Sequence, residues 1–268
     1  MTSELNTLIT DIDKRFGVLR KDKVECHVHG AYVAIQTKHS DKPSGCPTCA
    51  EEVRKAAEEA ERKAATKRMA EQRLERRLGA ALIPPRFQGK TFDDYRATTP
   101  SQRKNLETCR DYAAQFPANL EEGRSLLLLG KVGTGKTHLA NAIAGYVIVQ
   151  HGCTAVYRTV TGIMQYVKGS FGNGAGYTET DAHEALISPD LLIIDEVGAT
   201  KPTEFEQATI FNIINGRYEQ CRPTIVISNL MPEELPAAIG ERCVDRLREG
   251  GGKALVFDWA SARKGNAA

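Results

Sequence analysis

The strongest constraint on the fold lies in residues 130–137, whose sequence is GKVGTGKT. An apolar run precedes this segment at 125–129, and apolar residues at helical spacing follow it at 139–148, closed by Gly152. Glycines between a strand and a helix let the backbone wrap around phosphate oxygens without Cβ clashes, so that amide groups and the helix N-terminus face negative charge. The motif in this context therefore predicts a phosphate-binding loop.

A nucleoside triphosphate with Mg²⁺ is the ligand that such a loop takes. We expect the ammonium group of Lys136 to lie between the β- and γ-phosphates and the hydroxyl of Thr137 to bind Mg²⁺. The predicted ATP contacts come from the whole loop and the residue after it, namely Gly130, Lys131, Val132, Gly133, Thr134, Gly135, Lys136, Thr137 and His138.

Two carboxylates follow a second apolar run. Residues 191–194 (LLII) lead directly into Asp195 and Glu196, which is a Walker B pattern. We expect Asp195 to hold the Mg²⁺ coordination sphere and Glu196 to orient and deprotonate the attacking water. The pair favours ATP hydrolysis over phosphoryl transfer to a metabolite.

Apolar runs also predict the sheet that carries these residues. They lie at 125–129, 154–159, 191–194, 224–228 and 253–257. Near-continuous hydrophobicity indicates strands buried on both faces, and their alternation with helical patterns predicts an α/β fold with a doubly wound parallel sheet. Asn229 directly follows the run at 224–228, a position from which an amide can reach the γ-phosphate and the attacking water.

Length and composition limit what surrounds this core. With 268 residues, 41% of them apolar and 26% charged, the chain can form one α/β domain plus a smaller addition. A net charge of +2 neither requires nor excludes a nucleic-acid partner. The sequence has no apolar run long enough to span a membrane and no signal region at its start, so we expect a cytoplasmic protein without membrane contact.

Residues near the N-terminus have the spacing of metal ligands. Residues 26–29 (CHVH) and 46–49 (CPTC) form two knuckles that can close a tetrahedral zinc site. The predicted Zn²⁺ ligands are Cys26, His29, Cys46 and Cys49, with His27 or His39 as alternatives to His29. Such a metal would supply folding free energy that a small loop-rich segment lacks. An odd total of seven cysteines argues against a disulfide framework.

The sequence before residue 83 differs from the rest in organisation. An apolar stripe at helical spacing predicts a short amphipathic helix that ends at Gly17. This helix packs either on its own domain or on a partner. The stripe consists of Leu5, Leu8, Ile9, Ile12 and Phe16. Residues 51–78 lack Gly and Pro and predict a long, exposed, charged helix. We expect an N-terminal helix and zinc-binding module at 1–50, a charged helix and linker at 51–82, and an ATPase domain at 83–268.

Residues 83–263 resemble the DnaC/IstB group of AAA+ ATPases, and within it the DnaC-type replicative helicase loaders. The resemblance rests on IPPRF at 83–87, TFDDY at 91–95, the two nucleotide motifs, RPTI at 222–225, GERCVDRL at 240–247 and FDWASAR at 257–263. It implies an AAA+ core whose helical lid domain is essentially missing. It also implies that Asn229 acts as sensor 1.

The same resemblance implies roles for arginines near the C-terminus. Arg246, with Arg242 beside it, matches the arginine-finger region, which acts on ATP bound by the adjacent subunit. Arg263 matches the sensor 2 arginine, which acts in cis. A guanidinium at the γ-phosphate neutralises charge that develops during cleavage, so a finger supplied in trans makes hydrolysis depend on assembly.

A segment between the two nucleotide motifs matches an element that touches single-stranded DNA in helicase loaders. Residues 163–173 predict an amphipathic helix that runs into a glycine-rich loop. By this resemblance Phe171 would stack on a base and Lys168 would approach a phosphate. The alternative for Phe171 is a core aromatic residue that closes the helix.

The leading hypothesis is an ATP-dependent loader of the replicative DNA helicase onto single-stranded DNA during replication initiation. Its implied partners are the helicase, single-stranded DNA and further copies of itself in the ATP state. The alternatives are an IstB-like transposition helper ATPase on duplex DNA, and a non-hydrolysing zinc and nucleic-acid-binding module with a relic ATP site. The N-terminal cysteines depart from the DnaC pattern, so residues 1–78 are expected to hold the helicase, touch DNA, or do both.

Overall fold

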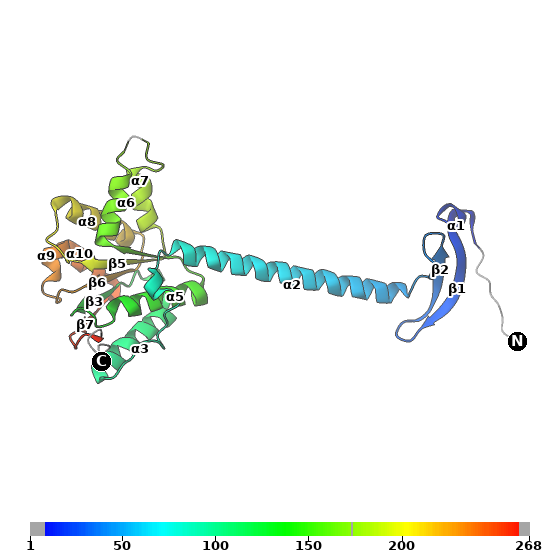
Figure 1. The fold of residues 1–268 in the computed structure, drawn as a ribbon, viewed down its shortest axis with the longest axis horizontal. Helices are drawn as coiled ribbons and strands as arrows, with labels where there is room; N and C mark the ends of the chain where they lie inside the picture. The colour runs from blue at the N-terminus through cyan, green and yellow to red at the C-terminus, as the bar shows by residue number, and fades with distance from the viewer. Residues whose placement is uncertain (1–8, 173, 263–268) are drawn as a thin grey trace. The chain divides into compact units, whose positions relative to one another are not determined.

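The computed structural model describes residues 9–172 and 174–262 (Figure 1). The chain forms two compact units, Met1–Glu71 and Gln72–Ala268, and the helix α2 (Pro47–Ala80) runs from the first into the second. Among the helices of the described residues, none combines the length and the apolar character needed to cross a lipid bilayer.

The larger unit is built on a five-stranded sheet with the strand order β4-β5-β6-β3-β7. Its strands are β3 (Leu126–Gly130), β4 (Ala155–Thr159), β5 (Leu191–Val197), β6 (Thr224–Ser228) and β7 (Lys253–Phe257). Every neighbouring pair is parallel, so all carboxyl ends lie at one edge of the sheet. The predicted α/β fold with a parallel sheet is confirmed. β5 continues beyond its predicted run, through the two carboxylates.

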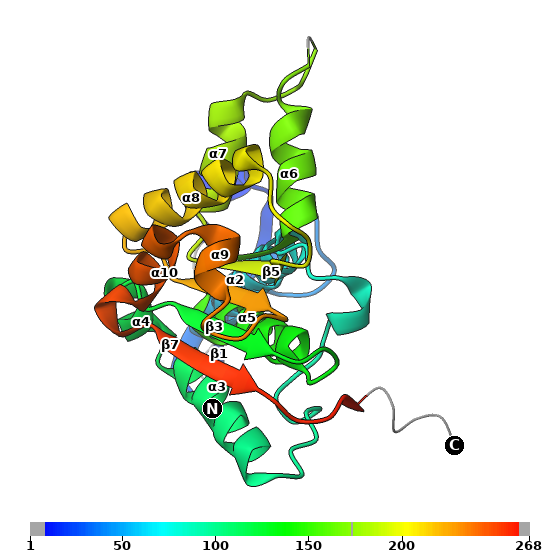
Figure 2. The same ribbon diagram turned by 90° about the vertical axis from the view of Figure 1, so that its left-hand side faces the viewer.

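Both faces of the sheet are covered by helices, because alternate side chains of each strand enter separate cores. Leu126 and Leu128 belong to one core, and Leu127 and Leu129 belong to the other. The first core is closed by α3 (Pro100–Ala114), α4 (Phe116–Glu121) and α5 (Lys136–His151). The second is closed by α6 (Val160–Gly169), α7 (Glu179–Ile187), α8 (Glu204–Glu219), α9 (Leu235–Ile239) and α10 (Glu241–Arg248). Figure 2 shows α3 and α6 on opposite sides of the sheet.

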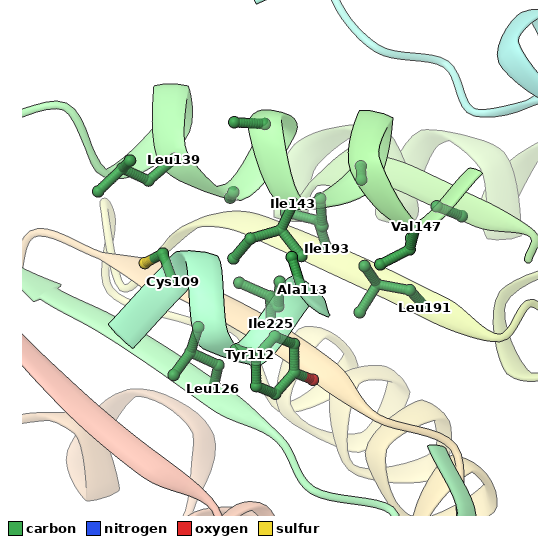
Figure 3. Close-up of a cluster of buried hydrophobic side chains, with 14 of the residues drawn as sticks. Cys109, Tyr112, Ala113, Leu126, Leu139, Ile143, Val147, Leu191, Ile193 and Ile225 are labelled. Atoms are coloured by element: carbon green, nitrogen blue, oxygen red, sulfur yellow. The ribbon is translucent and has the colours of Figure 1, made fainter. Parts of the chain in front are cut away.

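Figure 3 shows how the first core is packed. Side chains from α3 and α5 meet the sheet in a layer that includes Cys109, Tyr112, Ala113, Leu139, Ile143, Val147, Leu126, Leu191, Ile193 and Ile225. This layer holds α5, the helix that follows the glycine-rich loop, against the strands that end beside that loop.

Threonines define where several helices of the larger unit begin. In each case the hydroxyl accepts a hydrogen bond from a backbone N–H in the first turn; the residues are Thr99 before α3, Thr159 before α6, Thr178 before α7 and Thr203 before α8. Such a cap contributes about 1 kcal/mol. Short 3₁₀ turns lie at Pro85–Phe87 (η1) and Glu249–Gly251 (η2). Between β7 and Ala262, where the described residues end, no α-helix follows.

The smaller unit contains α1 (Asp11–Arg15), an antiparallel hairpin of β1 (Val18–Cys26) and β2 (Gly30–Thr37), and the first part of α2. The predicted N-terminal helix is shorter than expected, and its members Leu5 and Leu8 lie outside the described residues. Ile12 and Phe16 are 69% and 72% exposed, so these two do not pack on their own unit. The long charged helix is present, and α2 buries none of its residues.

Arg217 holds the larger unit together at the amino ends of β5 and β6. It is fully buried on α8, and its guanidinium donates hydrogen bonds to the carbonyl oxygens of Ile187, Pro189 and Pro223 at 2.6–2.8 Å and to Thr224 Oγ1 at 3.0 Å. Burial lowers the pKa of Arg217 to about 9, so the group is still charged at pH 7. One side chain thereby satisfies carbonyls of two separate loops.

Replacing Arg217 with Met should destabilise the larger unit by about 3 kcal/mol or more, because several buried carbonyls lose their donors. Urea unfolding followed by the emission of Trp259, the only tryptophan of the chain, measures this loss. Arg248→Met, at an exposed position of α10, is the control and should change the unfolding midpoint little. Equal midpoints for the two variants would contradict the role given to Arg217.

Candidate nucleotide site and metal centre

The loop between β3 and α5 adopts a conformation that only glycine permits at two positions. Gly130 and Gly135 have φ angles of 116° and 96°. A Cβ atom on Gly130 would lie 2.6 Å from the carbonyl oxygen of Phe257, and one on Gly135 would lie 2.4 Å from Cε2 of Tyr95. The loop therefore packs directly on β7 and on the segment before α3, and its backbone is free to face a ligand on the other side.

Lys136 connects the loop to the end of β6. Its side chain is nearly buried, with 5% of its surface exposed. Nζ donates hydrogen bonds to the carbonyl oxygens of Gly130 at 2.6 Å and Lys131 at 2.7 Å, and to Oδ1 of Asn229 at 3.1 Å. The structure thus brings together Lys136 and Asn229, which lie far apart in the sequence.

Asp195 lies at the centre of a second set of hydrogen bonds. Its Oδ2 accepts from Thr137 Oγ1 at 2.9 Å and from the hydroxyl of Tyr157 at 2.8 Å, and its Oδ1 accepts from the backbone N–H of Glu196 at 2.7 Å. The hydroxyl and carboxylate of Thr137 and Asp195 are the hard oxygen donors that Mg²⁺ takes in nucleotide sites. These two predicted Mg²⁺ ligands are therefore side by side.

Tyr157 contacts the candidate site through its hydrogen bond to Asp195, although no sequence pattern marks it. It lies on β4, next to β5 in the sheet, and Thr159 pairs with Asp195 in the ladder. Burial and then the neighbouring carboxylate raise the pKa of the Tyr157 phenol, so the phenol stays protonated and donates to Asp195. Only the strand order places this hydroxyl at the site.

A β-bulge directs the side chain of Glu196 away from the core. Ile194 pairs with Val226 and Val197 pairs with Ser228, so Asp195 and Glu196 together stand opposite one residue of β6. Glu196 has a φ angle of 63°, and its side chain is exposed while Asp195 is buried. Bulges that reorient side chains are common beside active sites. The sequence predicted the two carboxylates, but it did not predict that the two side chains would point in different directions.

These groups line a cleft with a volume of about 420 Å³. The predicted residues on its walls are Val132, Gly133, Thr134, Gly135, Lys136, Thr137, His138, Asp195, Glu196 and Asn229, and the segment before α3 adds Arg86, Phe87 and Lys90. Gly130 and Lys131 are not among the residues on the walls, but their carbonyl oxygens accept hydrogen bonds from Lys136. The cleft combines a cation, an oxygen pair for a metal and an exposed carboxylate, which is the donor set for a metal–triphosphate complex.

The loop is also held by residues from both ends of the larger unit. The hydroxyl of Tyr95 and the indole nitrogen of Trp259 donate to the carbonyl oxygen of Thr134, at 3.0 and 3.2 Å. The N–H of Ala262 donates to the carbonyl of Gly133 at 2.9 Å. The chain after β7 therefore runs along the loop. Arg263 follows Ala262 and lies outside the described residues.

Arg242 and Arg246 are separate from this cleft. They lie one turn apart on α10, and neither is among the residues on the walls of the cleft. The guanidinium of Arg246 lies over the rings of Phe211 and Tyr218, 5.4 and 5.1 Å from their centroids, and within the described residues its buried Nη1 has no hydrogen-bond partner. Arg242 is exposed. The fold does not bring these arginines to the phosphate loop of their own chain.

Lys168 and Phe171 form a small aromatic cluster with Phe205, at the end of α6. The rings of Phe171 and Phe205 meet edge to face with centroids 5.9 Å apart, and Nζ of Lys168 lies 5.5 Å from the centroid of Phe205. Phe171 is 53% exposed, so it is not a core residue. Phe205 belongs to α8, so the sequence did not indicate its place in the cluster.

The four predicted zinc ligands converge in the smaller unit. Cys26 is the last residue of β1, His29 lies in the turn before β2, Cys46 precedes α2, and Cys49 lies in the first turn of α2; their ligand atoms all lie within 4.8 Å of one another. His29 Nδ1 is 3.2, 3.8 and 3.9 Å from the sulfurs of Cys49, Cys46 and Cys26. A tetrahedral zinc site requires separations of about 3.5–3.8 Å. His27 and His39 are exposed and outside this group.

The thiols of this cluster influence one another strongly. Hydrogen bonds from the backbone N–H groups of Val28 and His29 lower the pKa of Cys26 to about 6. The neighbouring Cys26 raises the pKa of Cys49 to about 12. Three adjacent thiolates repel one another, and a bound divalent cation removes this repulsion. The donor set therefore suits a thiolate-binding metal such as zinc.

Comparison with known proteins gives one consistent result. The model of the family described as "IstB-like ATP binding protein" matches residues 56–246. The chain is 36% identical over 197 residues to a protein named "Replicative helicase loader DnaC" from Buchnera aphidicola subsp. Acyrthosiphon pisum (strain APS), covering 72% of this chain and 78% of that protein. The protein of the same name from Escherichia coli (strain K12) is 35% identical over 191 residues, covering 71% and 76%.

A solved structure agrees with these sequence matches. The crystal structure of the DnaC helicase loader superposes with a TM-score of 0.59 at 25% identity, covering 65% of this chain and 100% of that one. The family match begins at residue 56, so the hairpin and the cysteine cluster lie outside it.

Replacing Tyr157 with Phe should raise the Mg²⁺ concentration needed for half-maximal ATP binding by about 3- to 10-fold. The variant loses one hydrogen bond to Asp195, worth about 0.5–1.5 kcal/mol. Because Trp259 contacts the loop, its emission can report binding. Tyr146→Phe removes a hydroxyl outside the nucleotide cleft and is the control. An unchanged Mg²⁺ requirement in Tyr157→Phe would refute the positioning of Asp195 by Tyr157.

Proposed function

Since this chain belongs to the IstB-like ATP-binding proteins, within the DnaC/IstB group of AAA+ ATPases, we propose that it is an ATP-dependent loader of a replicative DNA helicase onto single-stranded DNA. The observation that carries the loader role is the 35–36% identity, over more than 70% of the chain, to proteins named replicative helicase loaders. The observation that supports ATP turnover is the convergence of Lys136, Asp195 and Glu196 on one cleft.

In this proposal each residue of the cleft has its own role in ATP hydrolysis. Lys136 binds the β- and γ-phosphates, and Thr137 and Asp195 hold Mg²⁺. Glu196, turned out by the bulge, orients the attacking water and takes its proton, while Asn229 contacts the γ-phosphate and that water. The metal supplies charge neutralisation at the phosphates.

The three arginines are assigned to two different nucleotides, that of an adjacent copy and that of their own chain. We assign Arg246, with Arg242 beside it, to the ATP of an adjacent copy, because neither lies in the cleft of its own chain. Arg263 is assigned to the nucleotide of its own chain by its match to sensor 2. Self-association in the ATP state follows from this division, because hydrolysis then needs two subunits.

Single-stranded DNA is assigned to the cluster at the end of α6. Phe171 offers an exposed ring for stacking, and Lys168 offers a positive charge for a phosphate. In this scheme residues 1–50 form a zinc module that contacts the helicase, 51–82 connect it, and 83–268 form the ATPase.

The zinc assignment is supported by the lack of a hydrophobic core around the cluster. In residues 9–71, the described part of the smaller unit, Ala34 and Cys46 are the only buried residues. Burial of so little apolar surface does not offset the chain entropy of folding. A metal bound by Cys26, His29, Cys46 and Cys49 would provide the missing free energy.

Glu196→Gln should lower ATP hydrolysis by about 100-fold or more and leave ATP affinity nearly unchanged, because the amide cannot accept the proton of water. Phosphate release and Trp259 emission measure the two quantities. Glu233→Gln, at an exposed position outside the cleft, should behave like the parent. If Glu196→Gln and the parent hydrolyse ATP at the same rate, the cleft is a relic binding site.

The loader role is tested with the replicative helicase of the same cell. With ATP, the protein should co-purify with the helicase and increase the amount of helicase deposited on circular single-stranded DNA. Failure in both assays contradicts the proposal. Assembly on duplex DNA without helicase binding would instead indicate a transposition helper of the IstB kind.

Metal analysis of the purified protein should find about one zinc per chain, since the cluster holds one set of four ligands. Cys46→Ser should lose most of this zinc. Cys221→Ser changes an exposed cysteine outside the cluster and should retain it. Equal zinc content in the two variants would rule out the assigned ligands.

A further inference from the structure

The histidine of the metal centre has a second contact that bears on how it binds the metal. His29 Nδ1 faces the three sulfurs, and His29 Nε2 lies 3.0 Å from Oε1 of Glu52. We infer that Glu52 is a positioning residue of the metal centre, which orients His29 with Nδ1 toward the metal and raises metal affinity. This inference rests on the zinc centre proposed above.

The chemistry of imidazole explains why the carboxylate selects the ligand atom. A neutral imidazole carries one proton, and an ionised carboxylate can only accept a hydrogen bond. With Glu52 at Nε2, the proton resides on Nε2 and the lone pair of Nδ1 points at the sulfurs. A carboxylate hydrogen-bonded to the far nitrogen also makes a histidine ligand more basic and restricts its rotation.

The helix supplies this carboxylate on the same side as its sulfurs. Cys49 and Glu52 lie three residues apart in the first two turns of α2 and so share one side of the helix, and Cys46 directly precedes the helix. That side faces Cys26 at the end of β1 and His29 in the turn before β2. Glu52 therefore links the helix to the hairpin through a contact that does not involve sulfur.

The neighbouring Glu51 offers a matched control. It has the same charge and adjoins Glu52 in the sequence, but its carboxylate pairs with Lys55 at 2.8 Å, and it is not among the groups around His29. Removing Glu51 changes the net charge of α2 as removal of Glu52 does. A difference between the two variants therefore isolates the contact with His29.

The expected loss of metal affinity depends on how exposed the Glu52 side chain is. Loss of a partner behind a metal-bound histidine lowers metal affinity by about 10- to 100-fold in known sites. The Glu52 side chain is 62% exposed, so water competes for its hydrogen bond, and we expect the lower end of that range. Glu52→Gln keeps an oxygen acceptor without the charge and should fall between Glu52→Ala and the parent.

The test measures metal affinity in the full-length protein and in Glu52→Ala, Glu52→Gln and Glu51→Ala. Competition with a chromogenic chelator gives the zinc dissociation constants. We expect about tenfold weaker binding for Glu52→Ala and parental binding for Glu51→Ala. The Co²⁺ forms should all show the absorption of a tetrahedral thiolate site, which establishes that the variants still fold around the metal. Long-range ¹H–¹⁵N spectra of the zinc-loaded parent should show the proton of His29 on Nε2.

Two results would overturn the inference alone: zinc affinity of Glu52→Ala within twofold of the Glu51→Ala control, or a His29 spectrum with the metal on Nε2. A parent protein that binds neither zinc nor cobalt would overturn the metal centre and the role of Glu52 together. ATP binding, measured by Trp259 emission, should stay parental in all variants, because the nucleotide cleft lies in the larger unit.

Discussion

The hydrogen bond between Thr137 and Asp195 is the contact on which the nucleotide site depends. It joins the first turn of α5 to the carboxyl end of β5, and so connects the phosphate loop to the strand that carries both carboxylates. The bond forms because β3 and β5 flank β6 in a parallel sheet, which places all their carboxyl ends at one edge. Lys136 makes the matching connection to Asn229 beyond β6. Together these bonds fix the positions of Lys136 and Asp195 relative to the phosphate loop.

The two units are stabilised by different physical means. The larger unit buries leucines and isoleucines on both faces of its sheet and satisfies its inner carbonyls with Arg217. In residues 9–71, the described part of the smaller unit, Ala34 and Cys46 are the only buried residues, and three thiols and an imidazole lie close together. A hydrophobic core tolerates conservative changes, since its free energy is distributed over many contacts. If the smaller unit binds the metal that we propose, it would depend on a few donor atoms, so its folding would respond to metal supply and to single substitutions.

The positions of the charged groups are consistent with an ATP site to which two subunits contribute residues. The phosphate loop and the side chains of Thr137, Asp195 and Glu196 line one cleft, whereas the guanidinium of Arg246 lies over the rings of Phe211 and Tyr218 outside it. A guanidinium over two aromatic faces keeps its charge and loses little rotational freedom when it meets a phosphate. In the arrangement that we propose, ATP hydrolysis would be coupled to assembly of the subunits.

Much of this protein could be predicted from the sequence alone, because some signals are local. The apolar runs specified the five strands, the motif at 130–137 specified the loop, and the spacing of Cys26, His29, Cys46 and Cys49 specified the cluster. The sequence did not reveal Tyr157, since a tyrosine on a strand gains its meaning only when the strand order places it beside Asp195. It did not reveal the bulge that separates Glu196 from Asp195, and it named His29 as a zinc ligand but left His27 and His39 open as alternatives. Those features depend on contacts between residues distant in the sequence, and only the tertiary structure decides which of them form.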